Sequence, residues 1–333
     1  MKFLKISIAI ILVGFVIPYF VISAWIYPES PEIKRSFEYK YSGYLEIDSF
    51  NKVDGYTAYI PKDYKEKSIP IVVLNHGWGA YNPMAHGAWI RHLVYQGYAV
   101  IFPRYQKSVL THASTYTNNA AHAIKSSIST IQEKFGVQPN TDEMVIFGHS
   151  YGGVISVNLA IKWQEFDIPK PKAIMSIQPG HGPIKSGRID DYSKFPEDIK
   201  LLLIYSEKDI VTGDEFAREV FDLNKNKVKD INLIKMFADK KEDEIIRAAH
   251  EDPLAMDPEF DKGTGFLVMF RAKMVYEINQ VDFDGFWKLG DALTQCAFYK
   301  KDCDKAFGNT PDQRYMGKWK DGSLIKEMNV TVN

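Results

Sequence analysis

Ser150 has the sequence context of an activated serine nucleophile. It is the central residue of Gly148-His149-Ser150-Tyr151-Gly152, a G-x-S-x-G pattern. Between a strand and a helix this pattern is typical of a nucleophile elbow, a strained turn that lifts the serine hydroxyl above the sheet edge. Glycines flank the turn because larger side chains would collide in it. The chemistry that such a serine predicts is acyl transfer through a covalent intermediate.

The segments beside the pattern have the composition that an elbow requires. An apolar run at residues 143–147 precedes it and predicts a short buried strand, and residues 154–161 can continue as a helix. The pattern alone arises by chance in about one chain in ten of this length. The rest of the chain therefore decides what the pattern means.

Apolar runs alternate with helical patterns along the middle of the chain. Strands are predicted near residues 71–74, 99–102, 143–147, 173–177, 201–205 and 231–237, and helices near 83–96, 118–135 and 214–223. Because these runs are apolar throughout, they predict an α/β fold with a mostly parallel, twisted sheet covered by helices on both faces. Alternating segments at 37–47 and 55–60 predict antiparallel strands at the start.

With these elements in place, the chain resembles the α/β-hydrolase superfamily of serine hydrolases from about residue 56 to residue 250. The resemblance is to esterase- and lipase-like members, including cutinase-like and acetylhydrolase-like enzymes. In that family the triad follows the order serine, acid, histidine. Asp209 lies just past the strand at 201–205, and His250 is the one histidine beyond it. The resemblance thus implies Ser150 as nucleophile, Asp209 as acid and His250 as base.

Alternatives to these two assignments stay open at the sequence level. Asp209 could instead be a helix N-cap or a loop carboxylate. Asp214, near the next helix start, is the second candidate acid. His250 could belong to an exposed helix end. In many relatives the histidine closely follows the last strand, whereas here a polar stretch at 238–244 intervenes. We expect that stretch to be a solvated face.

A second motif lies upstream, at the place where the family carries an H-G-x-G oxyanion loop. His76-Gly77-Trp78-Gly79 follows the strand at 71–74. The resemblance implies that the backbone N–H groups of Trp78 and Tyr151 hold the oxyanion. His76 would then hold the loop instead of acting as base.

Several residues near these motifs are candidates for substrate contacts. They are Gly77, Gly79, Tyr81, His149 and His181. Trp78, Tyr81 and Tyr151 would form an aromatic entrance suited to apolar or aromatic esters, an expectation that comes from the fold alone. His181 follows the strand at 173–177, where it lines the pocket or is a solvated loop residue.

Charge and composition exclude other classes of function. Lysine and arginine number 41 against 42 aspartates and glutamates, which is not the basic balance of a nucleic-acid-binding protein. Asp282-Phe283-Asp284-Gly285 lacks the other ligands of a calcium loop and predicts a helix start. We expect no metal, cofactor or nucleic-acid partner, and a small-molecule, lipid or polymer ester as substrate.

The N-terminus predicts export. Lys2 and Lys5 precede an uncharged, apolar stretch from Ile6 to Pro28, which is either a signal peptide or a membrane anchor. Its length and a poor cleavage site favour the anchor. Residues 1–28 are therefore set apart from one α/β-hydrolase domain at 29–333, whose end (about 263–333) adds helices and loop. The catalytic body should lie outside the cytoplasmic membrane.

Cys296 and Cys303 bear on the same question. On one continuous helix their Cα atoms would stand about 10 Å apart, too far for a disulfide. A helix that ends near Tyr299 and turns through Lys300-Lys301-Asp302 would bring them together. An extracytoplasmic compartment permits the bond, so we favour a disulfide over two unrelated thiols.

The sequence thus predicts an exported or membrane-anchored serine hydrolase that cleaves carboxylic esters through an acyl-enzyme. The same apparatus serves amidases, peptidases and acyltransferases. A membrane-tethered binding module with a degenerate hydrolase body is the alternative from another class.

Overall fold

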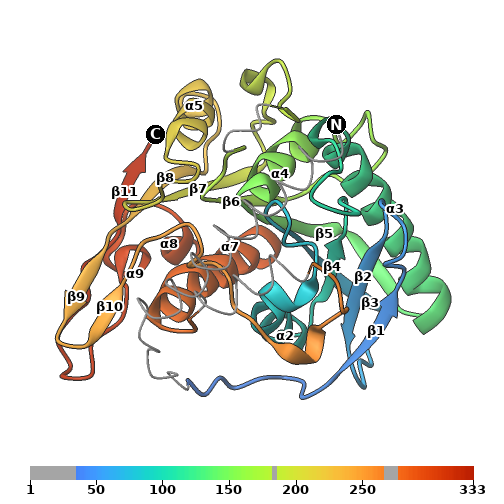
Figure 1. Ribbon diagram of the computed structural model, residues 1–333, viewed down its shortest axis with the longest axis horizontal. Helices are drawn as coiled ribbons and strands as arrows, with labels where there is room; N and C mark the ends of the chain where they lie inside the picture. Colours follow the sequence, from blue (N-terminus) through green and yellow to red (C-terminus); the bar gives the residue numbers. More distant parts are fainter. Residues whose placement is uncertain (1–34, 182–185, 266–276) are drawn as a thin grey trace, which may run out of the picture.

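Helices cover both faces of a large sheet in the computed structural model, which describes residues 35–181, 186–265 and 277–333 (Figure 1). Within these residues the sheet has nine strands in the order β1-β2-β4-β3-β5-β6-β7-β8-β11. The predicted signal peptide or anchor at 1–28 lies outside the described residues, as does part of the predicted 263–333 extension.

The strands follow the predicted apolar runs closely. They are β1 (Tyr44–Asp48), β2 (Tyr56–Pro61), β3 (Ser68–Asn75), β4 (Ala99–Pro103), β5 (Gln138–His149), β6 (Ala173–Ile177), β7 (Lys200–Ser206), β8 (Ile231–Met236) and β11 (Asn329–Val332). Strands β4, β3, β5, β6, β7 and β8 are parallel neighbours, whereas β1, β2 and β11 pair antiparallel. The predicted α/β class, with a mostly parallel sheet and antiparallel first strands, is confirmed.

The helices divide between the two faces of the sheet. The longer ones are α2 (Gly87–Gln96), α3 (Tyr116–Phe135), α4 (Tyr151–Ile161), α5 (Glu215–Asn224) and α7 (Lys288–Tyr299), followed by the short α8 (Cys303–Ala306) and α9 (Pro311–Arg314). Brief helical turns lie at Pro83–His86, Ala113–Thr115, Tyr192–Lys194 and Pro258–Phe260, and a π-helical segment, η5, at Val281–Trp287 leads into α7.

Alternate residues of the central strands feed two separate apolar cores. On β3, Ile71 and Val73 pack into the core beneath α3, α4 and α5, whereas Val72 and Leu74 pack into the core beneath α2 and α7. Successive side chains of a strand point to opposite faces, so a strand buried on both sides is apolar throughout. This is the physical origin of the continuous apolar runs in the sequence.

The first strand is shorter than predicted. Residues 37–47 were expected to be extended in the sheet, but β1 begins at Tyr44. The residues before it lie against α2 and the segment leading into α7: the Phe37 ring is 4.8 Å from the His92 ring, and Arg35 forms an ion pair with Asp284 at 2.7 Å. The alternating pattern there reflects aromatic packing on helices and not sheet pairing.

Two further strand segments were not predicted. The polar stretch at 238–244 contributes to a small hairpin of β9 (Asp239–Lys241) and β10 (Glu244–Ile246), and none of its residues is buried, in agreement with the expected solvated face. The tail, predicted as helices and loop, also contains β11, which completes the sheet beside β8. Local patterns do not reveal either pairing, because β11 pairs with a strand that is distant in the sequence and the β9–β10 hairpin is weakly apolar. None of the helices in the described part of the chain is long and apolar enough to cross a membrane.

Candidate active site

Ser150 lies in a sharp turn between β5 and α4. Strand β5 ends at His149, α4 begins at Tyr151, and Ser150 between them has φ 57° and ψ −121°. A positive φ is strained for a residue with a side chain and persists where the surroundings impose it. The Ser150 N–H donates to the Ile177 carbonyl at 2.9 Å, so β6 holds the turn.

The glycines of the motif have the predicted steric role. A β-carbon on Gly148 would overlap the carbonyl oxygen of Gly152, and one on Gly152 would overlap that of Asn75. The elbow therefore packs backbone against backbone. It also lies directly against the end of β3, from which the second motif continues.

The structure brings Ser150, His250 and Asp209 into one hydrogen-bonded row. His250 Nε2 lies 3.0 Å from Ser150 Oγ, and His250 Nδ1 lies 2.8 Å from Asp209 Oδ2. Ser150 and Asp209 are 6% and 7% exposed. An imidazole held between a hydroxyl and a carboxylate can accept a proton from the one while bound to the other. The arrangement can therefore activate a serine.

Asp209 is held in its ionised form. Its burial alone would raise the pKa, but the hydrogen bond and charge of His250, with donors of Thr212, outweigh burial and lower the pKa to about 2. Oδ1 accepts the N–H groups of Val211 and Thr212 at 2.9 and 3.0 Å, and Oδ2 accepts the Thr212 hydroxyl at 2.7 Å. Because an ionised carboxylate only accepts, His250 Nδ1 carries the proton and Nε2 is left to face Ser150.

The alternative acid lies elsewhere. Asp214 precedes α5 and its Oδ2 accepts from Arg218 Nε at 2.6 Å. Asp209, in contrast, binds the N–H groups of its own turn and the ring of His250. The geometry therefore pairs His250 with Asp209.

The His76-Gly77-Trp78-Gly79 loop runs beside the nucleophile. A β-carbon on Gly77 would lie 3.2 Å from Ser150 Cβ, so the loop backbone passes against the elbow. Gly79 has φ 77°, and its N–H donates to Gln106 Oε1 at 2.9 Å. Gly77 in this loop and Tyr151 at the N-terminus of α4 thus lie on either side of Ser150 along the contacts described.

His76 is packed inside the protein beneath this loop. Its ring stacks on Tyr105 with centroids 3.9 Å apart, and Nε2 and Nδ1 lie 2.7 and 2.6 Å from the carbonyl oxygens of Arg104 and Gly77. Burial lowers its pKa to about 3, so the ring is neutral at physiological pH and donates from one nitrogen. The Tyr105 hydroxyl in turn donates to the His76 carbonyl. These contacts support a structural role for His76.

The other predicted contact residues differ in their access to solvent. Trp78 is 40% exposed, whereas Tyr81 and Tyr151 are buried. The Tyr151 hydroxyl donates to the Ser186 carbonyl at 2.8 Å. His181, in the loop after β6, is partly exposed, and His149 is buried against the ring of His250 at 4.9 Å. Of the three predicted entrance aromatics, Trp78 is the one that reaches the surface.

Two glutamines support the site without any local sequence signal. Gln106 binds the Gly79 N–H and donates to the Tyr116 hydroxyl at 2.7 Å. Gln178 lies directly after β6 and donates to the Ser206 hydroxyl at 2.6 Å. Both are fully buried. The groups that they bind lie elsewhere in the sequence, so local patterns did not reveal either role.

No group of three or more His, Cys, Asp or Glu side chains able to hold a metal ion occurs within residues 35–181, 186–265 and 277–333.

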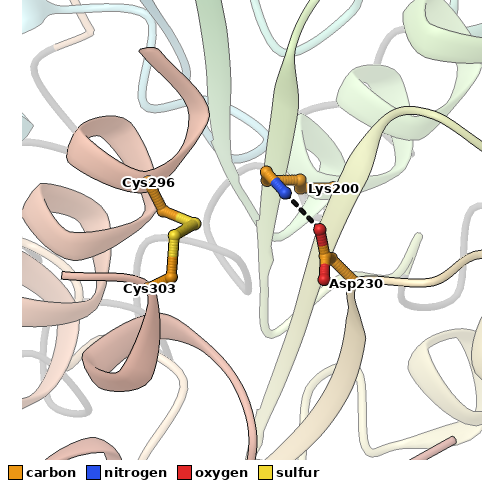
Figure 2. Close-up of a disulfide and its surroundings, with 4 residues drawn as sticks. All are labelled: Lys200, Asp230, Cys296 and Cys303. Carbon is orange, nitrogen blue, oxygen red and sulfur yellow. Dashed lines mark hydrogen bonds and ion pairs between the residues drawn. A yellow bond between two sulfur atoms is a disulfide. The ribbon is translucent and has the colours of Figure 1, made fainter. Parts of the chain in front are cut away.

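Cys296 and Cys303 form the disulfide that the sequence favoured (Figure 2). Helix α7 ends at Tyr299, Lys300 and Asp302 have left-handed φ values of 56° and 55°, and α8 begins at Cys303. This turn brings the Cα atoms to 4.7 Å. A disulfide is compatible with an extracellular protein.

The disulfide lies near the amino ends of the strands, whereas Ser150 lies at a carboxyl end. Figure 2 shows it near the ion pair of Lys200 and Asp230, residues at the amino ends of β7 and β8. Cys303 and Asp230 line one surface cavity of about 480 Å³. Ser150, in contrast, follows the carboxyl end of β5.

Comparison with known proteins gives a family match over part of the chain. Residues 50–192 match the family model described as chlorophyllase. This region includes Ser150 and the His76-Gly77-Trp78-Gly79 loop, and it ends before Asp209 and His250. The match supports a hydrolase that cleaves esters. No curated protein matches the chain.

Proposed function

We propose that the chain is an α/β-hydrolase, in line with its fold and the family match over residues 50–192, and that it is a serine hydrolase that cleaves carboxylic esters through an acyl-enzyme. One observation carries the proposal: His250 lies within hydrogen-bond distance of both Ser150 Oγ, at 3.0 Å, and Asp209 Oδ2, at 2.8 Å. The position of Ser150 in a strained turn, with its hydroxyl against His250, supports the same conclusion.

In the proposed reaction Ser150 Oγ attacks the ester carbonyl carbon while its proton passes to His250 Nε2. Asp209 stabilises the imidazolium through Nδ1. The alcohol leaves with the proton from Nε2, and the acyl group stays on Ser150. A water molecule then gives its proton to His250 Nε2 and attacks the acyl carbon. The bond to Ser150 Oγ breaks as Nε2 returns the proton to Oγ, and the carboxylic acid is released.

The tetrahedral oxyanion would be held by the backbone N–H groups of Tyr151 and Trp78. Tyr151 is the first residue of α4, where backbone N–H groups and the helix dipole favour negative charge. The close approach of Gly77 to Ser150 supports a role for the loop. Loss of one such donor typically costs about 3 kcal/mol of transition-state stabilisation.

For the substrate we propose an ester with an apolar or aromatic group. The half-exposed Trp78 ring supports this, because it presents apolar surface beside the candidate oxyanion donor. Gly77, Gly79, Tyr81, His149 and His181 remain candidates for shaping the pocket. The family name makes chlorophyll one ester to test.

A fluorophosphonate probe tests the reaction class. We expect folded protein to form an adduct on Ser150, identified by peptide mass spectrometry, and heat-unfolded protein or Ser150→Ala to form none. Absence of an adduct on the folded wild type would refute the serine hydrolase and favour the non-catalytic binding module. His250→Ala should lose ester hydrolysis, and full retained activity would refute its role as base.

A substrate panel separates the enzymes that share this apparatus. Nitrophenyl esters of short, long and aromatic acids should be hydrolysed faster than the matched anilides. Faster cleavage of the anilides would indicate an amidase or peptidase, and transfer to an added alcohol in preference to water would indicate an acyltransferase.

For location we propose that residues 29–333 form a hydrolase domain outside the cytoplasmic membrane, anchored by residues 1–28 or released after their cleavage. The Cys296–Cys303 disulfide and the apolar stretch from Ile6 to Pro28 support export. N-terminal sequencing of the mature protein tests this: retention of Met1 indicates an anchor, and a new terminus near residue 28 indicates a signal peptide. Free thiols in the protein isolated without reductant would argue against export.

A further inference from the structure

His250 lies far along the chain from β8, the last parallel strand of the large sheet before it. Strand β8 ends at Met236, and the β9–β10 hairpin stands between that strand and the histidine. A histidine directly after a strand takes its position from that strand. Here the long excursion removes this constraint, so other contacts must position the ring.

Those contacts are three hydrogen bonds at the carboxyl ends of neighbouring strands. Three successive carbonyls, of Ala248, Ala249 and His250, each accept a hydrogen bond from a different parallel strand. The donors follow or end β7, β6 and β5: they are the Lys208 N–H at 2.9 Å, Gln178 Nε2 at 2.6 Å and His149 Nε2 at 2.8 Å. Since β7, β6 and β5 are neighbours in the sheet, the histidine turn crosses their carboxyl ends one residue per strand.

His149 connects the nucleophile to this turn. It is the last residue of β5, directly before Ser150, and is 4% exposed. Its ring lies 4.9 Å from the His250 ring while its Nε2 donates to the His250 carbonyl. Burial, with the nearby His250 and His86, lowers the pKa of His149 well below its usual value. The ring is therefore neutral, and its one proton is committed to Nε2.

Gln178 makes the equivalent contact from β6. It is fully buried with φ 45°, and its side chain donates to both the Ser206 hydroxyl and the Ala249 carbonyl, at 2.6 Å each. Its own carbonyl accepts the Thr212 hydroxyl at 3.0 Å, which links it to the residue that supports Asp209.

We propose that His149 and Gln178 are positioning residues that set the height and register of His250 over Ser150. The inference rests on the proposed serine hydrolase and goes beyond the triad, because it assigns a function to the residue directly before the nucleophile. Both contacts are made by side chains, so each can be removed by one substitution outside the turn. The third contact, from Lys208, uses a backbone N–H and remains in every variant.

The kinetic test compares His149→Leu with His149→Gln. Leucine keeps apolar volume and removes the donor, whereas glutamine can place an amide N–H near the position of Nε2. We expect kcat for a nitrophenyl ester to fall by about 10- to 100-fold in His149→Leu with KM nearly unchanged, because misplacement by about 1 Å can cost on the order of 100-fold. His149→Gln should recover most of the loss. Gln178→Met should resemble His149→Leu.

His92→Leu is the matched control. His92 is another buried histidine, bonded to Tyr39 and Asp291 and located on α2, away from the turn. It should lose stability and keep kcat. Wild-type kcat in folded His149→Leu, or an equal loss in His92→Leu and His149→Leu, would overturn the proposal.

A second measurement does not require activity. Hydrogen exchange followed by mass spectrometry should show faster exchange of the peptide containing residues 248–252 in His149→Leu and Gln178→Met, and wild-type exchange in His149→Gln and His92→Leu. Unchanged exchange in His149→Leu would overturn the positioning role of His149, whatever reaction the protein catalyses. An inactive wild type with no adduct on Ser150 would instead refute the proposed function.

Discussion

Gly77 and Ser150 approach each other so closely that a β-carbon on Gly77 would stand 3.2 Å from Ser150 Cβ. Gly77 lies in the loop after β3 and Ser150 in the turn after β5, and both are held by hydrogen bonds to other segments. Ser150 is held by the Ile177 carbonyl, and the Gly77 loop is held through Gly79 by Gln106. The distance between the candidate oxyanion loop and the nucleophile is therefore set by the absence of a side chain at residue 77.

Replacing Gly77 with alanine should push this loop away from the nucleophile. We expect Gly77→Ala to lower kcat/KM for a nitrophenyl ester by about 10- to 100-fold, since a donor displaced from the oxyanion costs up to about 3 kcal/mol. Gly43→Ala is the control, because a β-carbon there meets the Lys62 side chain at an ordinary 3.5 Å. Equal activity of Gly77→Ala and wild type would separate the loop from catalysis.

The two candidate acids can be distinguished directly. Asp209→Asn should lower kcat by about 10⁴-fold, because the amide cannot hold the Nδ1–H tautomer of His250. Asp214→Asn, which loses an exposed ion pair with Arg218, should change kcat little. Both variants are measured with the same ester and checked for folding by circular dichroism. A large loss in Asp214→Asn alone would reverse the assignment.

Asp282 predicts an unusual dependence of stability on pH. The carboxyl group is 1% exposed, and burial raises its pKa well above the usual value. Its Oδ2 accepts the Asn279 N–H, and its Oδ1 has no hydrogen-bond partner in the described residues. A raised folded-state pKa means that the folded protein keeps a proton that the unfolded chain loses. This contribution to stability therefore declines as pH rises above about 4.

Asp282→Asn removes this dependence while keeping an oxygen for the Asn279 N–H. Urea unfolding should show the variant about 1–3 kcal/mol more stable than wild type at pH 8, and similar to it at pH 4. Exposed Asp142→Asn should show no such divergence. If Asp282→Asn followed the wild-type pH profile, the carboxyl group would not be the source of the effect.

The disulfide should contribute to stability and not to chemistry. It closes a loop between residues seven apart, for which chain entropy predicts about 2.5 kcal/mol. In urea unfolding, Cys296→Ala/Cys303→Ala should show a free energy of unfolding that is lower by that amount. It should keep the wild-type kcat, because the disulfide lies near the amino ends of the strands and Ser150 follows a carboxyl end. Reductant should destabilise the wild type and leave the double variant unchanged. A fall in kcat on reduction would contradict this separation.

Local sequence patterns were sufficient for the elements that carry Ser150 and Asp209. The second half of β5 and nearly all of β7 are buried, so their apolar runs are continuous, whereas the polar and largely exposed first half of β5 gave no strand signal and its start at Gln138 was not predicted. The glycines at 148 and 152 are required by contacts within the elbow and with β3, which makes the motif visible. Helix geometry excluded the disulfide on one continuous helix, and the export signal favoured it across a turn; the two cysteines do meet across the turn that follows α7.

Contacts between distant segments could not be obtained in this way. Nothing in the sequence near Gln178 indicates that its amide reaches Ala249, and His149 was predicted to contact substrate because its motif adjoins the nucleophile. The polar composition of residues 238–244 hid a hairpin whose strands pair with each other. In each case the role depends on a contact with another segment, which the residue type alone does not indicate.

Strand β11 pairs with β8 along Asn232–Lys235, yet it is formed by residues 329–332, almost a hundred positions later. Every other strand of the sheet is complete once residue 236 has been synthesised. Until then β8 has one unpaired edge, and such an edge recruits strands from other chains. The risk of aggregation during biosynthesis thus falls in the interval between residues 236 and 329, while the Ser150 elbow can already have formed.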